Sequence, residues 1–220
     1  GETTACYRLL TAEELQQYPI EADLHLATSS IRLARFWVPT RYAQLATYLA
    51  AQQWREADYE TLRLILEILD LKNEGYVDYA DIWKIPCDDL RIIDSLWMKF
   101  SKNKFGFSAQ KQVWLEVGGG LEGDSYSFWL RITKKVPVSV QRILPKFGIN
   151  LKSDEDRAFL LFSERVGWIN SEFKYDKMTF DISAPSGHFP SIGVSGKGDE
   201  GIEQGKGFYY FFSRMADCKL

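Results

Sequence analysis

The sequence is poor in the residues that most often bind metals or perform acid–base chemistry. It has two histidines, His25 and His188, and neither stands within a spaced set of cysteines or carboxylates. Metal sites made of protein side chains need such clusters at short spacing. No nucleophile elbow or phosphate-binding loop is present, and no dinucleotide fingerprint follows a strand pattern. The sequence therefore predicts no catalytic residues and no metal site.

Cysteine is scarce as well. The three residues Cys6, Cys87 and Cys218 are odd in number and widely spaced, without a Cys-x-x-Cys pair. This pattern argues against a disulfide framework and against a zinc site, and it is typical of a reducing compartment.

Long apolar runs and a strong net charge are also missing. No stretch approaches the ~18 consecutive apolar residues of a membrane-spanning helix, and the first residues show no signal-peptide pattern. Because the sequence begins at Gly1 rather than Met, the presence of a targeting segment ahead of it stays open.

The net charge of −3 argues against nucleic acid as a partner. Residues 121–152 are locally basic, with six Lys or Arg against two acidic residues, and are either a solvated surface or a docking segment.

Aromatic side chains are abundant instead. They make up 15% of the chain, with 7 Trp, 14 Phe and 11 Tyr. Such an excess favours a cavity for a flat apolar ligand or an interface. The alternative is an aromatic-rich core.

Hydrophobic periodicity predicts a mainly α fold. After an N-terminal extension over 1–39, apolar residues at helical spacing predict one helix from Thr40 and a second from Trp54, which together form a helical hairpin. A further helix is expected to begin at the acidic run that follows Ser153, and Gly167 is expected to end this helix. Seven of the 16 glycines fall between Gly187 and Gly207, which indicates a long functional or disordered loop.

The stretch 85–110 is the most informative part of the chain. Asp88 or Asp89 is expected to cap a helix whose buried stripe is Leu90, Ile93, Leu96, Trp97 and Phe100. A glycine turn follows at Phe105-Gly106-Phe107, and Ser108 is expected to cap the next helix.

These segments resemble the genomes-uncoupled-four family. The similar motifs, in the same order, are Trp54-Arg55-Glu56-Ala57-Asp58 with Thr61, residues 85–90 with 93–97, Phe105-Gly106-Phe107-Ser108-Ala109-Gln110-Lys111, Arg165-Val166-Gly167-Trp168, Thr179-Phe180-Asp181, residues 184–190 and Phe212-Ser213-Arg214.

The resemblance implies a compact helical domain over 40–220, shaped as a cupped hand with long loops covering a ligand groove. It implies a non-enzymatic protein without a cofactor of its own, whose ligand is protoporphyrin IX, magnesium protoporphyrin IX or a bilin. Such a protein regulates magnesium chelatase in chlorophyll synthesis through the porphyrin-binding large subunit. The implied location is the cytoplasm of a cyanobacterium or the plastid stroma, with peripheral association with the thylakoid or envelope membrane as a further option.

The resemblance also implies a tetrapyrrole site with apolar walls and cations for the propionates. Its candidate residues are Val77, Ile85, Phe105, Phe107, Gln110, Phe173, His188, Phe189, Ile192, Lys197 and Arg214. Lys206 and Arg165 are further cations, although Arg165 equally suits a helix end. His188 is either an axial ligand to a metal inside the tetrapyrrole or a residue that stabilises a turn.

Three features depart from the family pattern. Residues 121–152 look like an insertion, the loop over 191–206 lacks the family's arginine and tryptophan, and the extension before Thr40 is short. They leave open whether the chain activates the chelatase or is a divergent paralogue. The alternative function is a protein–protein scaffold that uses the helical hairpin and the basic insertion.

Overall fold

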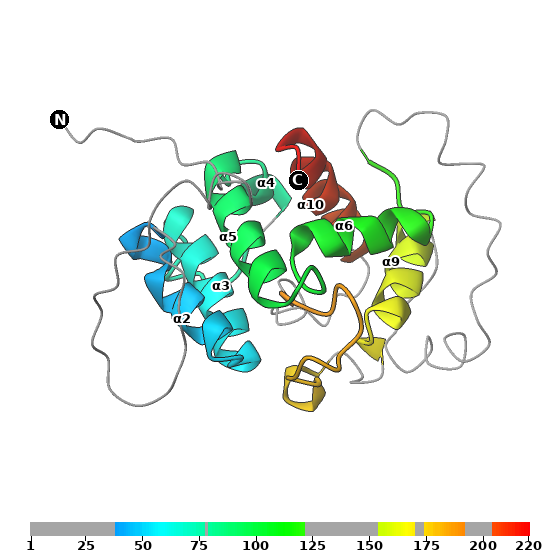
Figure 1. The fold of residues 1–220 in the computed structure, drawn as a ribbon. Coiled ribbons are helices and arrows are strands. Elements are labelled where there is room, and N and C mark those ends of the chain that lie inside the picture. The colour runs from blue at the N-terminus through cyan, green and yellow to red at the C-terminus, as the bar shows by residue number, and fades with distance from the viewer. Residues whose placement is uncertain (1–37, 78, 122–153, 170–173, 192–203) are drawn as a thin grey trace, which may run out of the picture. The chain divides into compact units, whose positions relative to one another are not determined.

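The computed structural model describes residues 38–77, 79–121, 154–169, 174–191 and 204–220 (Figure 1). The chain divides into two units, Gly1–Pro39 and Thr40–Leu220, and all of the described helices belong to the second. These elements are η1 (Thr40–Tyr42), α2 (Ala43–Ala50), α3 (Trp54–Ile68), α4 (Tyr79–Ile82), α5 (Cys87–Phe100), α6 (Phe107–Glu116), α9 (Asp154–Arg165), η4 (Tyr175–Lys177) and α10 (Gln204–Asp217). The described residues form no strand, which confirms the predicted mainly α class.

The core is largely aromatic. Trp97 of α5 is fully buried, donates from Nε1 to the Thr61 hydroxyl at 2.9 Å, and stacks with Phe189 at 5.9 Å between ring centroids. A second group of rings, with Trp114 and Phe162 at its centre, joins α6, α9 and α10. Much of the aromatic excess therefore fills the core, which is the alternative explanation for it.

The predicted helical hairpin is confirmed. α2 and α3 pack against each other across a three-residue connection, and α2 also packs on α5. The hairpin thus belongs to the same core as the central helix.

The predicted cap of α5 is wrong. The residue before α5 is Pro86, and neither Asp88 nor Asp89 caps the helix with its side chain. Both carboxylates still lie in the first turn, where they complement the helix dipole, and Asp89 accepts a hydrogen bond from the Tyr42 hydroxyl.

α6 begins one residue before the expected cap. Gly106 precedes the helix, and Ser108 lies inside it. The carboxylate of Asp94, from α5, accepts the Ser108 N–H at 2.8 Å and the Ser108 hydroxyl at 2.5 Å. A residue 14 positions earlier therefore provides the capping that the sequence predicts for Ser108.

The prediction from cysteine spacing is also wrong. Cys87 and Cys218 form a disulfide across 131 positions, because α10 returns the end of the chain to the first residue of α5. The argument from spacing to a reducing compartment therefore loses its basis.

Candidate functional site

The first group of candidate residues lies where α4, the α4–α5 junction and α10 meet. α10 packs against α4, and Arg214 of α10 reaches the Ile85 carbonyl with Nε at 3.3 Å and Nη2 at 2.8 Å. The third nitrogen, Nη1, lies 2.6 Å from a carboxylate oxygen of Asp217. We call this place the Ile85 corner. It consists of Trp83, Ile85 and Arg214.

Local sequence explains why this corner offers a carbonyl. Pro86 is extended, with φ −63° and ψ 139°, so the chain leaves α4 and enters α5 through a bend. The Ile85 carbonyl accepts hydrogen bonds from the Arg214 guanidinium, while the Ile85 side chain is buried. The guanidinium carbon also lies 5.8 Å from the Trp83 ring centroid, within the range of a cation–π contact.

The second group of candidates surrounds the glycine turn before α6. Phe105 and Phe107 are both fully buried. Phe105 meets Trp54 and Phe189 edge-on, and Phe107 meets Phe211 of α10 in the same way. In the structure these two rings are part of the core, and α10 connects their region to the Ile85 corner.

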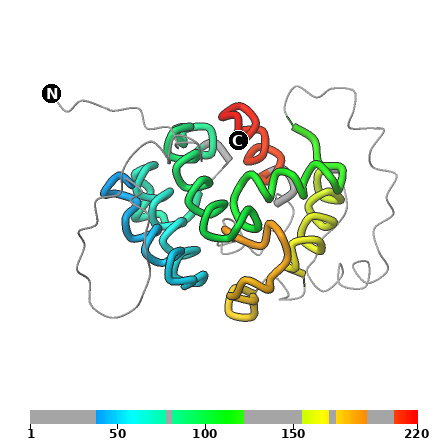
Figure 2. Tube along the Cα trace, viewed as in Figure 1, coloured from blue at the N-terminus to red at the C-terminus, as the bar shows by residue number. Residues whose placement is uncertain are grey.

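Gln110 is buried and fastens the segment that follows η4. Its Nε2 donates to the carbonyls of Gly187 at 3.0 Å and Pro190 at 2.7 Å. The Gly106 N–H adds a bond to the Phe189 carbonyl at 2.9 Å. Figure 2 shows this segment passing from η4 along the end of α9 to the turn before α6.

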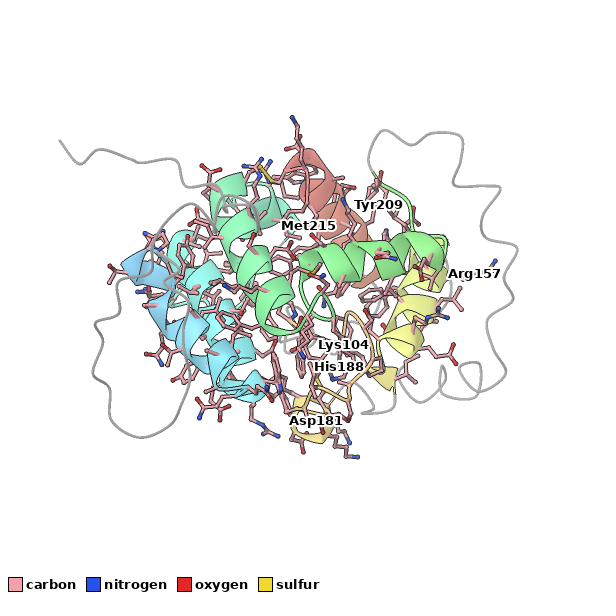
Figure 3. The ribbon with its side chains drawn as sticks, in the orientation of Figure 1. Lys104, Arg157, Asp181, His188, Tyr209 and Met215 are labelled. Atoms are coloured by element: carbon pink, nitrogen blue, oxygen red, sulfur yellow. A yellow bond between two sulfur atoms is a disulfide. The ribbon has the colours of Figure 1, made fainter. Side chains whose placement is uncertain are left out.

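His188 and Phe189 lie within that fastened segment. His188 is 1% exposed, and its Nδ1 lies 2.5 Å from the Val166 carbonyl. Because a carbonyl only accepts, Nδ1 carries the proton, and no described residue pairs with Nε2. Burial lowers the pKa of His188, so the ring is neutral at pH 7. Figure 3 shows His188 close to Lys104 and above Asp181.

One buried carboxylate is not among the sequence-predicted site residues. Asp58 of α3 accepts the Ser191 N–H at 2.6 Å and the Ser191 hydroxyl at 2.5 Å. Burial raises its pKa to about 6, although the bonds from Ser191 and Tyr175 oppose the rise. Asp58 lies within the first family motif, but no local pattern marks its partner 133 positions away. It holds the chain at the start of the glycine-rich segment.

The structure therefore places the candidates in two groups. Ile85 and Arg214 lie at the Ile85 corner, and Phe105, Phe107, Gln110, His188 and Phe189 lie at the α6 turn. Val77 lies two positions before α4 in the sequence. Phe173, Ile192, Lys197 and Lys206 lie outside the residues whose side chains are described. Arg165 is exposed, with Nη2 3.8 Å from a Glu116 oxygen.

Among the described residues, a single group of metal-binding types lies close together. It comprises Cys87, Asp217 and Cys218. Because the two sulfurs are bonded to each other, they are not thiolate ligands in this form.

Comparison with known proteins places the chain in a family. The model described as GUN4-like matches residues 38–198. The chain belongs to the GUN4-like family. The resemblance found in the sequence is thereby confirmed.

This GUN4-like chain is similar to several known proteins. It is 39% identical over 80 residues to the "Tetrapyrrole-binding protein, chloroplastic" of Arabidopsis thaliana, a match that covers 36% of this chain and 30% of that protein. It is 37% identical over 93 residues to the ycf53 protein of Porphyra purpurea, covering 41% and 37% of the two chains. The Ycf53-like protein of Synechocystis is 23% identical over 156 residues, covering 69% and 51%. The chain thus matches about half or less of the length of these relatives.

Two solved structures are also similar. The ligand-free GUN4 of Arabidopsis thaliana has a TM-score of 0.45 and 26% identity, covering 69% of this chain and 81% of that one. GUN4 from Chlamydomonas reinhardtii has a TM-score of 0.48 and 20% identity, covering 93% and 96%. Over the described residues of the GUN4-like chain, no helix combines the length and apolar character required to cross a membrane.

Proposed function

We propose that this chain binds a tetrapyrrole reversibly, without changing it chemically, at the Ile85 corner. The observation that carries the proposal is the Arg214 guanidinium, which lies 5.8 Å from the Trp83 ring beside the buried Ile85. A tetrapyrrole with propionates is a flat apolar ring with anionic edges, so it suits an aromatic face next to a guanidinium. Family membership and the name of the Arabidopsis relative support the same ligand class.

The bonds of Arg214 determine how a ligand carboxylate would enter. Nε and Nη2 are held by the Ile85 carbonyl, whereas Nη1 faces Asp217, whose side chain is 58% exposed. A propionate would therefore compete with Asp217 for Nη1, while the Ile85 bonds keep the guanidinium oriented. This arrangement makes Arg214 a pre-oriented cation.

The finer parts of the proposal rest on the family resemblance. The ligand would be protoporphyrin IX, magnesium protoporphyrin IX or a bilin, and the bound protein would stimulate magnesium chelatase through its porphyrin-binding large subunit. The other candidates stay proposed ligand contacts outside the corner as defined here. Phe105, Phe107, Gln110, His188 and Phe189 form the buried second group at the α6 turn, Val77 precedes α4, and Phe173, Ile192 and Lys197 lie outside the described residues. The proposed place of action is the cyanobacterial cytoplasm or the plastid stroma.

Titration with deuteroporphyrin IX tests the binding. Quenching of tryptophan fluorescence at micromolar ligand is expected for the intact chain. Arg214→Gln should weaken binding about tenfold, the effect of losing one charge-assisted contact. Arg63→Gln is the matched control, because Arg63 pairs only with Glu60 and Glu67 of its own helix among described residues. Absence of quenching in the intact chain would refute the proposal.

Asp217→Asn gives a test with the opposite sign. Removing the competing carboxylate should tighten deuteroporphyrin binding several-fold, because Nη1 is then free for the ligand. An unchanged affinity in Asp217→Asn, together with an unchanged affinity in Arg214→Gln, would move the site away from this corner.

A chelatase assay tests the regulatory part. Adding the chain to magnesium chelatase with deuteroporphyrin as substrate should raise the rate, and Arg214→Gln should raise it less. A chain that binds deuteroporphyrin and leaves the rate unchanged would be a paralogue with another role. The scaffold alternative stays a prediction, because α2 of its hairpin packs against α5 and its basic insertion over 121–152 lies almost entirely outside the described residues.

A further inference from the structure

The Cys87–Cys218 disulfide joins two elements that other contacts already hold together. Arg91 Nε donates to the Cys218 carbonyl at 2.9 Å, and Lys111 Nζ donates to the Leu220 carbonyl. Arg214 bonds the Ile85 carbonyl one turn before Cys218. Because these hydrogen bonds also join α10 and the residues after it to the rest of the fold, the fold has the means to persist after the sulfur bond opens.

We propose that Cys87–Cys218 is a thiol–disulfide exchange site, reduced by a dithiol, that controls the Ile85 corner. The inference rests on the proposed function only for its effect on ligand affinity. The exchange itself is a property of the cysteine pair. The disulfide is drawn as a yellow bond in Figure 3.

The two sulfurs differ in accessibility, which sets the direction of attack. Cys218 is fully buried, whereas Cys87 is partly exposed at the first residue of α5. An incoming thiolate therefore attacks the sulfur of Cys87 and expels Cys218 as a thiolate, which takes a proton. This step forms a mixed disulfide between Cys87 and the reductant.

The second step releases Cys87. The other thiol of the reductant attacks its own sulfur in the mixed disulfide, and Cys87 leaves as a thiolate. The backbone N–H groups at the start of α5 stabilise that thiolate. In sum, the protein disulfide gains two electrons and two protons, and the dithiol becomes a disulfide.

The consequence reaches Arg214 through the last turn of α10. The Cys218 N–H donates to the Arg214 carbonyl at 3.0 Å, so the sulfur bond anchors the turn that carries the guanidinium. Asp217, which accepts a hydrogen bond from Nη1 of Arg214, lies between Arg214 and Cys218 in the sequence. Opening the disulfide frees this turn, and Arg214 is then held less rigidly over Trp83.

Thiol counting tests the exchange without any ligand. The chain is equilibrated with graded ratios of reduced to oxidised dithiothreitol, alkylated and measured by mass spectrometry. One alkylated cysteine, Cys6, is expected in the oxidised form and three in the reduced form, with circular dichroism unchanged across a reversible transition. Cys6→Ser is the control and should shift each count down by one. Three free thiols at all ratios, or reduction only on unfolding, would overturn the proposal.

The direction of attack has its own test. Cys218→Ser incubated with oxidised glutathione should form a glutathione adduct on Cys87. Cys87→Ser under the same conditions should react with Cys218 far more slowly. Equal adduct formation on both would refute the assigned polarity.

The link to the Ile85 corner is measured with deuteroporphyrin IX. The reduced chain should bind it about threefold to tenfold more weakly, the effect of releasing one ordered side chain. Cys6→Ser should show the same redox dependence. Equal affinity in both redox forms refutes the control of the corner. Failure of both forms to bind refutes the proposed function, while the thiol count still decides the exchange.

Discussion

At the scale of single residues, the buried carboxylates carry bonds that the chain cannot easily replace. Asp58 and Asp94 each accept both the N–H and the hydroxyl of one serine, Ser191 and Ser108 respectively. Burial raises the pKa of both carboxylates. A group whose pKa is raised by folding stabilises the fold at low pH, and this contribution is lost as pH rises through the folded pKa.

Asp58→Asn should therefore remove part of the pH dependence of stability. With a folded pKa of about 6, Asp58 should make the intact chain lose about 1–2 kcal/mol more than the variant between pH 5 and pH 8. Urea unfolding at both pH values measures this difference. Asp94 is present in both proteins, so its similar contribution cancels. Equal losses in the two proteins would contradict the raised pKa of Asp58.

At the scale of elements, the turn before α6 depends on a glycine. Gly106 has φ 133° and ψ 166°, a backbone conformation that residues other than glycine rarely adopt. A Cβ at this position would lie 2.8 Å from Oδ1 of Asp94 and 3.0 Å from Cγ of Met98. The carboxylate that would be hit is the one that holds the start of α6.

Gly106→Ala is expected to cost roughly 3–4 kcal/mol of unfolding free energy, through backbone strain and the loss of the Asp94 bonds. Gly75→Ala is the matched control. It also has a positive φ, 74°, but a Cβ there meets nothing within 4 Å, so its cost should be roughly 1–2 kcal/mol. Chemical denaturation of the two variants compares them. Similar costs would show that the contact with Asp94 contributes little.

Elements defined by local pattern could be predicted from the sequence, whereas contacts between distant residues could not. The helices beginning near Thr40, Trp54 and Asp154 follow from apolar spacing and their termini, which are local properties. Asp94 serves α6 from 14 positions away, and Ser191 meets Asp58 across 133 positions. Such pairs depend on how helices pack, which periodicity does not specify.

The same limit applies to the candidate site. The family motifs indicate Arg214 and Ile85, which the structure brings together. They do not indicate that Arg214 donates to the Ile85 carbonyl or that its Nη1 donates to the Asp217 carboxylate. Phe105, Phe107 and Phe189 are predicted ligand contacts, and all three are fully buried in the core. An aromatic side chain at a turn looks the same in sequence whether it touches a ligand or a neighbouring ring.

At the scale of the whole molecule, the disulfide closes the longest covalent loop in the described structure. It joins the first residue of α5 to the residue after α10, and the two cysteines are 131 positions apart. Most of the unit Thr40–Leu220 lies inside this loop. Opening it returns conformational freedom chiefly to the unfolded chain, so the bond affects stability more than its few contacts suggest.

The double variant Cys87→Ser, Cys218→Ser should lose about 2–5 kcal/mol of unfolding free energy, with the loop-entropy model for a loop of this length giving the upper end. Guanidinium unfolding should show a lower midpoint, and also a larger slope if the oxidised unfolded state is the more compact one. Cys6→Ser should change neither. Treating the intact chain with dithiothreitol should reproduce the loss seen in the double variant, because both changes open the same loop.

A double variant as stable as the oxidised chain would contradict the loop-entropy argument. The bond would then serve exchange chemistry without contributing to stability, and the contacts of Arg91, Lys111 and Arg214 would be enough to hold α10 in place.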